Sequence, residues 1–440
     1  MKAFFDEGGH TCYVVRACVH DSAGKQLPKA AAITLTAAGG GTPPNVLAIE
    51  ANSPGAWGNG LAVAVKHMDG GRFQLDVLQG GQVAEPAMTR LSMDKSSKDY
   101  VETRVNGVSQ FIHVTDKVPD QRPADPRPAP TAGFVPLTQG SDGTGSAGDN
   151  DYIGSDGLQA FDSVDDVNII AVPETVGRAV HVAGLAYCER RQDCFYIADC
   201  QRAITVPNDV LDFKAAEGAF FDGNAISSKY GALYAPWIEV LDPRGGKIAI
   251  PPSGAVAGRY AAVDATRGVH KAPAGVVDGK LISALGLTFN FLAADQERLN
   301  PKGINLIRSF PGVGAAIWGA RTVSGDPEWR YLNVRRLFIF LRQSILEGTT
   351  WVVFEPNDRT LWKSIERNVS AFLHLQWLSG ALVGATAAEA FYVKCDDETN
   401  PPESIKLGRV VTEIGVAPST PAEFVIFRIM QQDGGRGSAV

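Results

Sequence analysis

The sequence predicts a mixed α/β (α+β) chain of several domains, and three observations lead to this prediction. The 440 residues are enough for about three domains of about 150 residues each. Short alternating strands fill an early region, whereas apolar strands alternate with amphipathic helices further on. A stretch rich in proline and glycine separates the two regions. We therefore expect a β-rich subdomain, a central α/β layer and a C-terminal α/β domain that ends in a strand.

The composition argues against several classes of protein. Hydrophobic residues make up 45% of the chain, too many for a disordered protein. The net charge of −7 argues against nucleic acid as a partner, because neutralising phosphates requires a basic surface. Six scattered cysteines form no dense disulfide framework, and no run of about 20 apolar residues predicts a membrane span. We expect no signal peptide and a reducing cytoplasm.

The first two regions are predicted to hold mostly strands. Residues 1–44 begin with a helix end, a stop at Gly8-Gly9 and a strand from Cys12 (CYVVRACV). Tandem glycine after an apolar turn supplies the left-handed conformation that closes helices. Residues 45–115 form the predicted β-rich subdomain, because Gly, Asn and Pro turns separate its strands. Its four strands are predicted to begin at Asn45, Leu61, Arg72 and Ser109.

The next two regions differ sharply in composition. Residues 116–150 contain six prolines up to Pro136 and then the run QGSDGTGSAGDN. Such a stretch buries too little apolar area to offset its ordering cost, which predicts a linker or an exposed loop. Residues 151–320 place apolar strands near Val167 and Cys194 and helices near Pro207 and Ser253. This alternation predicts a central α/β layer with a buried, partly parallel sheet.

The last region, residues 321–440, is predicted to hold two helices and four strands. The helices begin near Asn333 and Asp358, and a strand lies between them from Thr349 (TTWVVFEP). The other strands begin near Ala390, Gly408 and Ala422. The final run, AEFVIFRIMQQ, is largely apolar on both faces. It therefore either closes its own sheet or adds to the sheet of a neighbour.

No motif assigns a chemical activity. The run GVGAAIWG from Gly312 places its third glycine two positions late for a dinucleotide fingerprint, so we interpret it as a tight turn. On one strand Cys12 and Cys18 would stand about 20 Å apart, too far for one zinc ion. The central cysteines are interpreted as small buried hydrophobes: Cys188, Cys194 and Cys200. Without a GxSxG or HExxH motif, we expect no catalytic residue, cofactor or metal, and no enzyme.

The helix from Asp358 carries a polar face opposite a wide apolar face. A solvated surface explains such a face in many proteins. The other interpretation is a basic stripe that meets an acidic partner. The residues of this stripe are Lys363, Arg367, Ser370 and His374.

Several ordered segments carry a family resemblance. Early segments are FFDEGGHTCYVVR from Phe4, NSPGAWGNGLAV from Asn52, YAPWIEVLDP from Tyr234 and PPSGAVAGRYAAVDATRGVHKAPAG from Pro251. Later segments are LNPKGINLIRSFPGVGAAIWGART from Leu299, YLNVRRLFIFLRQSI from Tyr331 and GVAPSTPAEFVIFRI from Gly415. Together they resemble the contractile tail sheath family of phages and related contractile injection systems.

The resemblance implies a structural subunit. Sheath subunits polymerise as stacked six-membered rings around an inner tube, contract to drive the tube through a target envelope, and exchange strands from their termini. It implies that the C-terminal domain faces the tube, with Lys363, Arg367, Ser370 and His374 as candidate tube-facing residues. It also implies an inter-subunit strand made of Glu423, Phe424, Val425, Ile426, Phe427, Arg428 and Ile429.

The implied partners are further copies of the chain or its paralogues, the inner tube protein, and baseplate and terminator or cap proteins, without nucleic acid contact. The implied location is the bacterial cytoplasm during assembly and then a phage tail or phage-tail-like particle. Against the family pattern, we expect residues 1–44 to be without the N-terminal arm, because Met1 stands three residues before Phe4. An internal start, a trimmed chain and a different linkage all explain this. The alternative function is an α/β enzyme or small-molecule binding protein.

Overall fold

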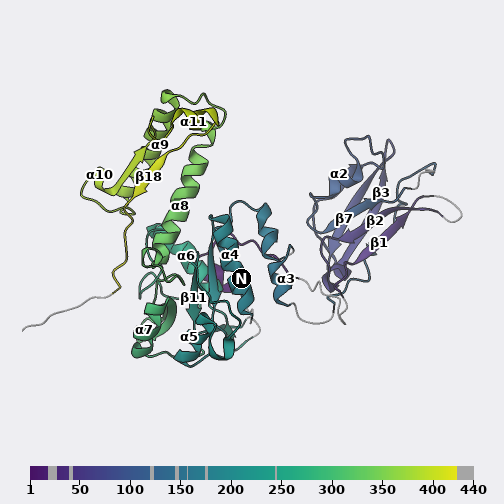
Figure 1. Ribbon diagram of the computed structural model, residues 1–440. Helices are drawn as coiled ribbons and strands as arrows, with labels where there is room; N and C mark the ends of the chain where they lie inside the picture. The colour runs from purple at the N-terminus through teal and green to yellow at the C-terminus, as the bar shows by residue number, and fades with distance from the viewer. Residues whose placement is uncertain are drawn as a thin grey trace, which may run out of the picture. The chain divides into compact units, whose positions relative to one another are not determined.

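The chain divides into two compact units, and the computed structural model describes residues 1–17, 27–38, 43–118, 123–143, 148–155, 157–173, 177–242 and 245–423. The main unit comprises Met1–Val15 and Tyr152–Val440, and the inserted unit comprises Arg16–Asp151. The inserted unit therefore interrupts the main unit along the chain. Figure 1 labels the helices and strands of both units.

The inserted unit consists of two antiparallel sheets around one apolar core. One sheet has the order β1-β2-β7 and the other β5-β4-β3-β8, with β6 paired to β4. Both sheets contribute to the core, for example Leu47 of β2 and Val63 of β3. The four strands predicted between residues 45 and 115 are confirmed, and buried and half-buried positions alternate along β4. The strands are β1 (Ala32–Thr36), β2 (Asn45–Ala51), β3 (Leu61–Met68), β4 (Arg72–Gln79), β5 (Gln82–Val83), β6 (Met88–Leu91), β7 (Ile112–Asp116) and β8 (Val135–Pro136).

Part of the proline-rich stretch belongs to this unit. Within residues 123–143, β8 pairs with β3, and the Val65 amide donates a hydrogen bond of 3.0 Å to the Thr131 hydroxyl. Isolated bridges also join this segment to Lys29 and Ala32. Proline is tolerated there because it lies at the border of a sheet, where one backbone donor is dispensable. The described part is thus an irregular edge of the unit rather than a free tether.

A five-stranded sheet forms the centre of the main unit. Its order is β16-β15-β11-β10-β9, and all neighbours are parallel except β16, which runs antiparallel to β15. Strands β10 and β11 are buried along their whole length, as expected for apolar strands covered on both faces. The predicted buried and partly parallel sheet is confirmed. The strands are β9 (Ile169–Ala171), β10 (Phe195–Asp199), β11 (Gly231–Ala235), β15 (Ile304–Phe310) and β16 (Gly314–Ile317).

Helices surround this sheet, and a smaller sheet of order β13-β12-β14 accompanies it. Helices α4 and α6 contact β10, and α1 packs on α6. The run from Gly312 begins in the hairpin turn between β15 and β16, with φ of +75° at Gly312, and continues as β16, so the interpretation as a turn is confirmed for its first residues alone. The elements of the main unit here are α1 (Lys2–Asp6), α4 (Arg178–Arg191), α5 (Pro207–Ala215), α6 (Ser253–Arg267), α7 (Ala293–Leu299), β12 (Ile238–Leu241), β13 (Lys247–Ile250) and β14 (Gly286–Leu287). Helix α2 (Val101–Val105) belongs to the inserted unit, and α3 (Asp149–Ile153) spans the point in the chain where the inserted unit ends.

The C-terminal part of the main unit combines helices with a two-stranded sheet. Helix α8 enters two apolar cores: Leu332 and Ile339 lie in the core of the parallel sheet, whereas Leu337 and Leu341 lie in a C-terminal core. Figure 1 shows α8 running between these two groups of elements. The apolar face predicted on α9 is confirmed by its burial. The elements are α8 (Leu332–Gly348), α9 (Arg359–Leu378), α10 (Ala387–Ala390), β17 (Phe391–Lys394), α11 (Pro402–Lys406) and β18 (Glu413–Val416).

Two predicted strands are wrong within the described residues. Residues 12–17 have no regular structure, and Tyr13 and Val14 are 45% and 60% exposed; the rest of that prediction, from residue 18, lies outside the described residues. The segment from Thr349 forms a 3-10 turn over Thr350–Val352. β-branched and aromatic side chains favour a strand only where a neighbouring strand accepts the backbone hydrogen bonds. Neither segment has such a neighbour in the part of the chain that the structure describes.

Candidate functional site

The four predicted stripe residues lie on one side of α9. Lys363, Arg367 and His374 are exposed and Ser370 is half-buried, whereas Leu373 faces the C-terminal core. The spacing of three and four residues brings the four side chains onto a common face. The structure thus gathers them into one surface.

The charge of this surface is smaller than the sequence suggests. The Lys363 ammonium donates a hydrogen bond of 2.5 Å to the Glu366 carboxylate, which raises the pKa of Lys363. Arg359, one turn earlier, pairs with Asp397 at 2.6 Å. Arg367 forms no ion pair with any residue that the structure describes. Arg367 is therefore the cation of this face that is ready for an external partner.

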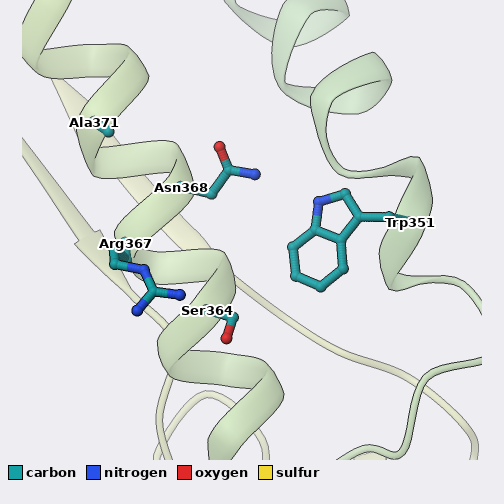
Figure 2. A pocket seen from close by; sticks show the side chains of 5 residues that line it. All are labelled: Trp351, Ser364, Arg367, Asn368 and Ala371. Atoms are coloured by element: carbon teal, nitrogen blue, oxygen red, sulfur yellow. The ribbon is translucent and has the colours of Figure 1, made fainter.

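Arg367 also lines an open hollow of about 520 Å³. Figure 2 shows Ser364, Arg367 and Asn368 on α9, with the indole of Trp351 facing them from the turn after α8. The Trp351 indole nitrogen donates a hydrogen bond of 3.0 Å to the Gly348 carbonyl, which fixes the ring. An open hollow with a cation and an aromatic ring suits a protruding side chain of another protein.

A second concave surface, the apolar groove, has a volume of about 380 Å³ and lies between α8, α9 and β18. Among the described residues β18 pairs only with β17. An unpaired edge presents N–H and C=O groups that another strand can bind. The groove therefore adjoins a possible site of strand addition. Its apolar lining includes Phe338, Leu341, Ile345, Leu373, Ile414 and Val416.

Glu423, the first residue of the predicted inter-subunit strand, is bound to its own chain. Its carboxylate accepts hydrogen bonds from Arg321 at 2.8 and 2.5 Å and from Asn300 at 2.7 Å. Burial alone would raise the pKa of Glu423, but these bonds outweigh burial and hold it below its ordinary value. Glu423 is thus an anchor on the subunit body. The other six residues lie outside the described residues: Phe424, Val425, Ile426, Phe427, Arg428 and Ile429.

A buried carboxylate caps a helix inside the central core. Asp199 ends β10, is 4% exposed, and accepts hydrogen bonds from the Ser253 amide at 2.8 Å and hydroxyl at 2.6 Å. Burial raises the pKa of Asp199 to about 7, although the bonds from Ser253 oppose this shift. The sequence signal was an acidic residue inside the apolar run CFYIADC, and it was overlooked.

Helix α8 buries two consecutive arginines that sequence reasoning also missed. The Arg336 guanidinium forms an ion pair with Asp264 of α6 and lies 4.5 Å from the centre of the Tyr260 ring. The Arg335 guanidinium lies 4.4 Å from the centre of the Trp329 ring. Two charged residues within the apolar run LNVRRLFIFL were the available signal.

The central cysteines are buried, which confirms their interpretation as core residues. The sulfur atoms of Cys188 and Cys194 lie 3.3 Å apart in the core of the parallel sheet. In the described part of the chain, no three His, Cys, Asp or Glu side chains gather in an arrangement that could hold a metal ion. No helix in that part is both long and apolar enough to cross a bilayer.

Two protein-family models match consecutive parts of the chain. Residues 145–323 match the phage tail sheath protein central domain, and residues 324–432 match the phage tail sheath C-terminal domain. Together they cover most of the main unit, including the parallel sheet, α8, α9 and the apolar groove. The inserted unit lies almost entirely before the first match.

Individual relatives agree with these matches. The tail sheath protein of Vibrio phage KVP40 is 29% identical over 178 residues, which is 40% of this chain but only 26% of that protein. The sheath of an extracellular contractile injection system (PVC) in its contracted state has 30% identity and a TM-score of 0.55 over 62% of this chain and 73% of that one. The contracted helical sheath of the anti-feeding prophage has 29% identity and a TM-score of 0.53 over 68% and 78%.

Proposed function

Because the chain belongs to the contractile tail sheath family, we propose that it is the repeating subunit of a contractile sheath around an inner tube. In this proposal the subunits stack as six-membered rings, and the sheath shortens to drive the tube through a target envelope. Its ends meet baseplate and terminator or cap proteins. The matched relatives are structural sheath proteins of phage tails and tail-like particles, which supports a structural rather than a catalytic role.

The proposal depends above all on the open edge of β18 beside the apolar groove. Isolated two-stranded sheets are marginal in water, and a third strand adds main-chain hydrogen bonds along a whole edge. The run Phe424–Ile429 is apolar on both faces except for Arg428, so the face of Val425, Phe427 and Ile429 suits the groove while the other face covers the sheet from solvent. A second copy of the chain would supply this strand.

The anchor at Glu423 explains how such a strand could link two moving bodies. In each subunit Arg321 would hold Glu423, where the terminal segment begins, while the neighbouring subunit binds the residues after Glu423. The paired side chains are only 9% and 14% exposed, which protects the ion pair from competition by water. The exchanged strand is therefore proposed to begin at Phe424 rather than at Glu423.

Deleting residues 424–432 tests this proposal. We expect a folded, monodisperse subunit that forms no cylinders in electron micrographs, because the donated strand is lost while Glu423 keeps its partners. Replacing Ile426 with proline should have the same effect by removing a backbone donor from the ladder, whereas Ile426→Val should assemble normally. Cylinders of ordinary appearance from the deletion would contradict the proposal.

The stripe on α9 is proposed to face the tube, and charge reversal tests it. We expect Arg367→Glu to weaken co-sedimentation with the tube protein about tenfold and to spare sheath–sheath contacts, if the tube surface is acidic. Lys363→Glu should have a smaller effect, because Lys363 already pairs with Glu366. The matched control is Arg104→Glu on α2 of the inserted unit, an exposed arginine that has no ion pair among the described residues. If Arg367→Glu and the control bind the tube protein equally well, then the stripe does not contact the tube.

A further inference from the structure

Arg335 is a buried cation held by aromatic rings alone. It is 6% exposed, and its guanidinium lies 4.4 Å from the ring centre of Trp329, 4.5 Å from that of Tyr230 and 5.9 Å from that of Phe338. A second cation, the Lys229 ammonium, lies 4.9 Å from the centre of the Trp329 ring. We call these five residues the arginine cage.

The arginine cage contains no acid. Among the described residues Arg335 forms neither an ion pair nor a side-chain hydrogen bond, and its buried Nε has no partner. Buried arginines are almost always paired, because an uncompensated charge in a protein interior is costly. Burial and the nearby charge of Arg342 accordingly lower the pKa of Arg335. The Glu423 carboxylate, which accepts a hydrogen bond from Tyr331 just before α8, is already held by Arg321 and Asn300.

The neighbouring arginine provides the contrast. Arg336 is also 6% exposed, but Asp264 neutralises it through an ion pair. Burial opposes the charge of Arg336, yet the attraction of Asp264 outweighs it and leaves the pKa of Arg336 raised. Arg336 thus has a carboxylate partner in its own subunit, whereas Arg335 has none among the described residues.

The arginine cage adjoins the apolar groove. Phe338 lines the groove and meets Trp329 edge to face at a centroid distance of 5.1 Å. Arg342 also lines the groove and has no ion pair among the described residues, and its charge acts on Arg335 in the adjoining cage. An apolar strand followed by an acid would match such a surface in both shape and charge.

The terminal segment has this pattern, apart from Arg428 within the apolar run and Arg436 after the acid. After Glu423 the sequence reads FVIFRIMQQDGGRGSAV, in which Asp433 is the one acidic side chain. At about 3.3 Å per residue, the run Phe424–Met430 spans about 23 Å, and the α8 residues from Phe338 to Thr349 that line the groove span about 16 Å. A strand that fills the groove therefore places Asp433 beyond its end.

We propose that the arginine cage is a carboxylate socket, and that Asp433 of a neighbouring copy of the chain occupies it when subunits assemble. This inference rests on the proposed strand exchange and adds to it a polar contact that fixes how far the donated strand enters. A subunit without its neighbour would carry an unpaired buried cation. Assembly would remove this penalty, so the socket favours the polymer over the free subunit.

The experiment compares full-length variants in two measurements, thermal unfolding of the free subunit and the critical concentration for cylinder formation. We expect Arg335→Met to leave the melting temperature of the subunit unchanged or higher, because it removes an uncompensated charge and keeps the aromatic contacts. The same variant and Asp433→Asn should each raise the critical concentration about tenfold, and the double variant should be no worse than either single one. The matched control, Arg336→Met, should lower the melting temperature by about 5 °C or more, since Asp264 loses its partner.

Two results would overturn the socket. If Arg335→Met destabilises the free subunit as Arg336→Met does, then Arg335 serves the fold. If Asp433→Asn assembles like the unmodified chain, then Asp433 is not the occupant. The strand exchange is tested separately by the deletion of residues 424–432. If that deletion variant assembles normally, the strand exchange itself is wrong, whereas the two results above contradict the socket alone.

Discussion

Replacing Gly258 with alanine is expected to lower the free energy of unfolding by about 3 kcal/mol, although alanine favours a helix more than glycine does. Gly258 lies in α6 where α1 crosses it. A Cβ atom there would stand 2.2 Å from the Phe4 carbonyl oxygen and 2.9 Å from the Glu7 Cβ. Because the first obstacle is backbone, no side-chain rotation relieves it, and α1 would have to leave α6.

Displacing α1 would also break a buried polar contact. The Glu7 carboxylate is 1% exposed and accepts hydrogen bonds of 2.7 Å from both the amide and the hydroxyl of Ser283. The control is Gly254→Ala in the same helix, where an added Cβ meets nothing within 4 Å. We expect this control to be neutral or stabilising by up to about 1 kcal/mol in urea unfolding. Equal effects of the two substitutions would contradict the close contact.

Asp199 is expected to make the subunit less stable as the pH rises from about 4 to 7. The pKa of Asp199 is raised from 3.8 to about 7, so in this interval the folded chain retains a proton that the unfolded chain has released. Stability falls with pH wherever the native state binds more protons. The rise of the Asp199 pKa from 3.8 to about 7 corresponds to about 4 kcal/mol of folding stability, and this stability is fully lost above pH 7.

The measurement must separate the effect of Asp199 from that of His181, because His181 changes the stability with pH in the opposite direction. Burial lowers the pKa of His181 from 6.5 to about 4, so the unfolded chain binds the extra proton between these values and stability rises with pH there. We therefore compare the unmodified chain with Asp199→Asn by urea unfolding at pH 5 and pH 8. Asp199→Asn should gain stability relative to the unmodified chain at pH 8, by up to about 4 kcal/mol, and much less at pH 5. A constant difference would show that Asp199 is charged at both values.

The sequence predicted the regular elements well where burial alone decides them. The apolar strand β10 and the amphipathic helix α9 follow from periodicity, because each presents a continuous or one-sided apolar surface. The strand from Thr349 was wrong because its β-branched and aromatic residues have no strand to pair with among the described residues. β1 was missed because nothing in AITLT distinguishes it from a loop until β2 lies beside it.

Contacts between distant segments were beyond the reach of one sequence. The segments FFDEGG and SGAVAGRY were noticed separately, yet the structure shows that Phe4 and Glu7 of the first press against Gly258 of the second. In the same way, nothing near Glu423 in the chain reveals that Arg321 binds it. The stripe residues of α9 were found by spacing, but their charge depends on Glu366, which lies on the same helix and was not considered. The charge that a surface presents depends on which of its side chains form ion pairs. Those pairs are visible only in the folded structure.

The course of α8 determines how a mechanical disturbance spreads through the main unit. Its early turns are embedded in the core of the parallel sheet and its middle turns in the C-terminal core, with no glycine or proline between Leu332 and Glu347. Sharp kinks in a helix need glycine, proline or an inserted group, so the sequence of α8 provides no site for a kink between the two cores. Torque applied at one end would reach the other as rotation instead of being absorbed midway. Helix α8 therefore couples the two cores as one rigid element.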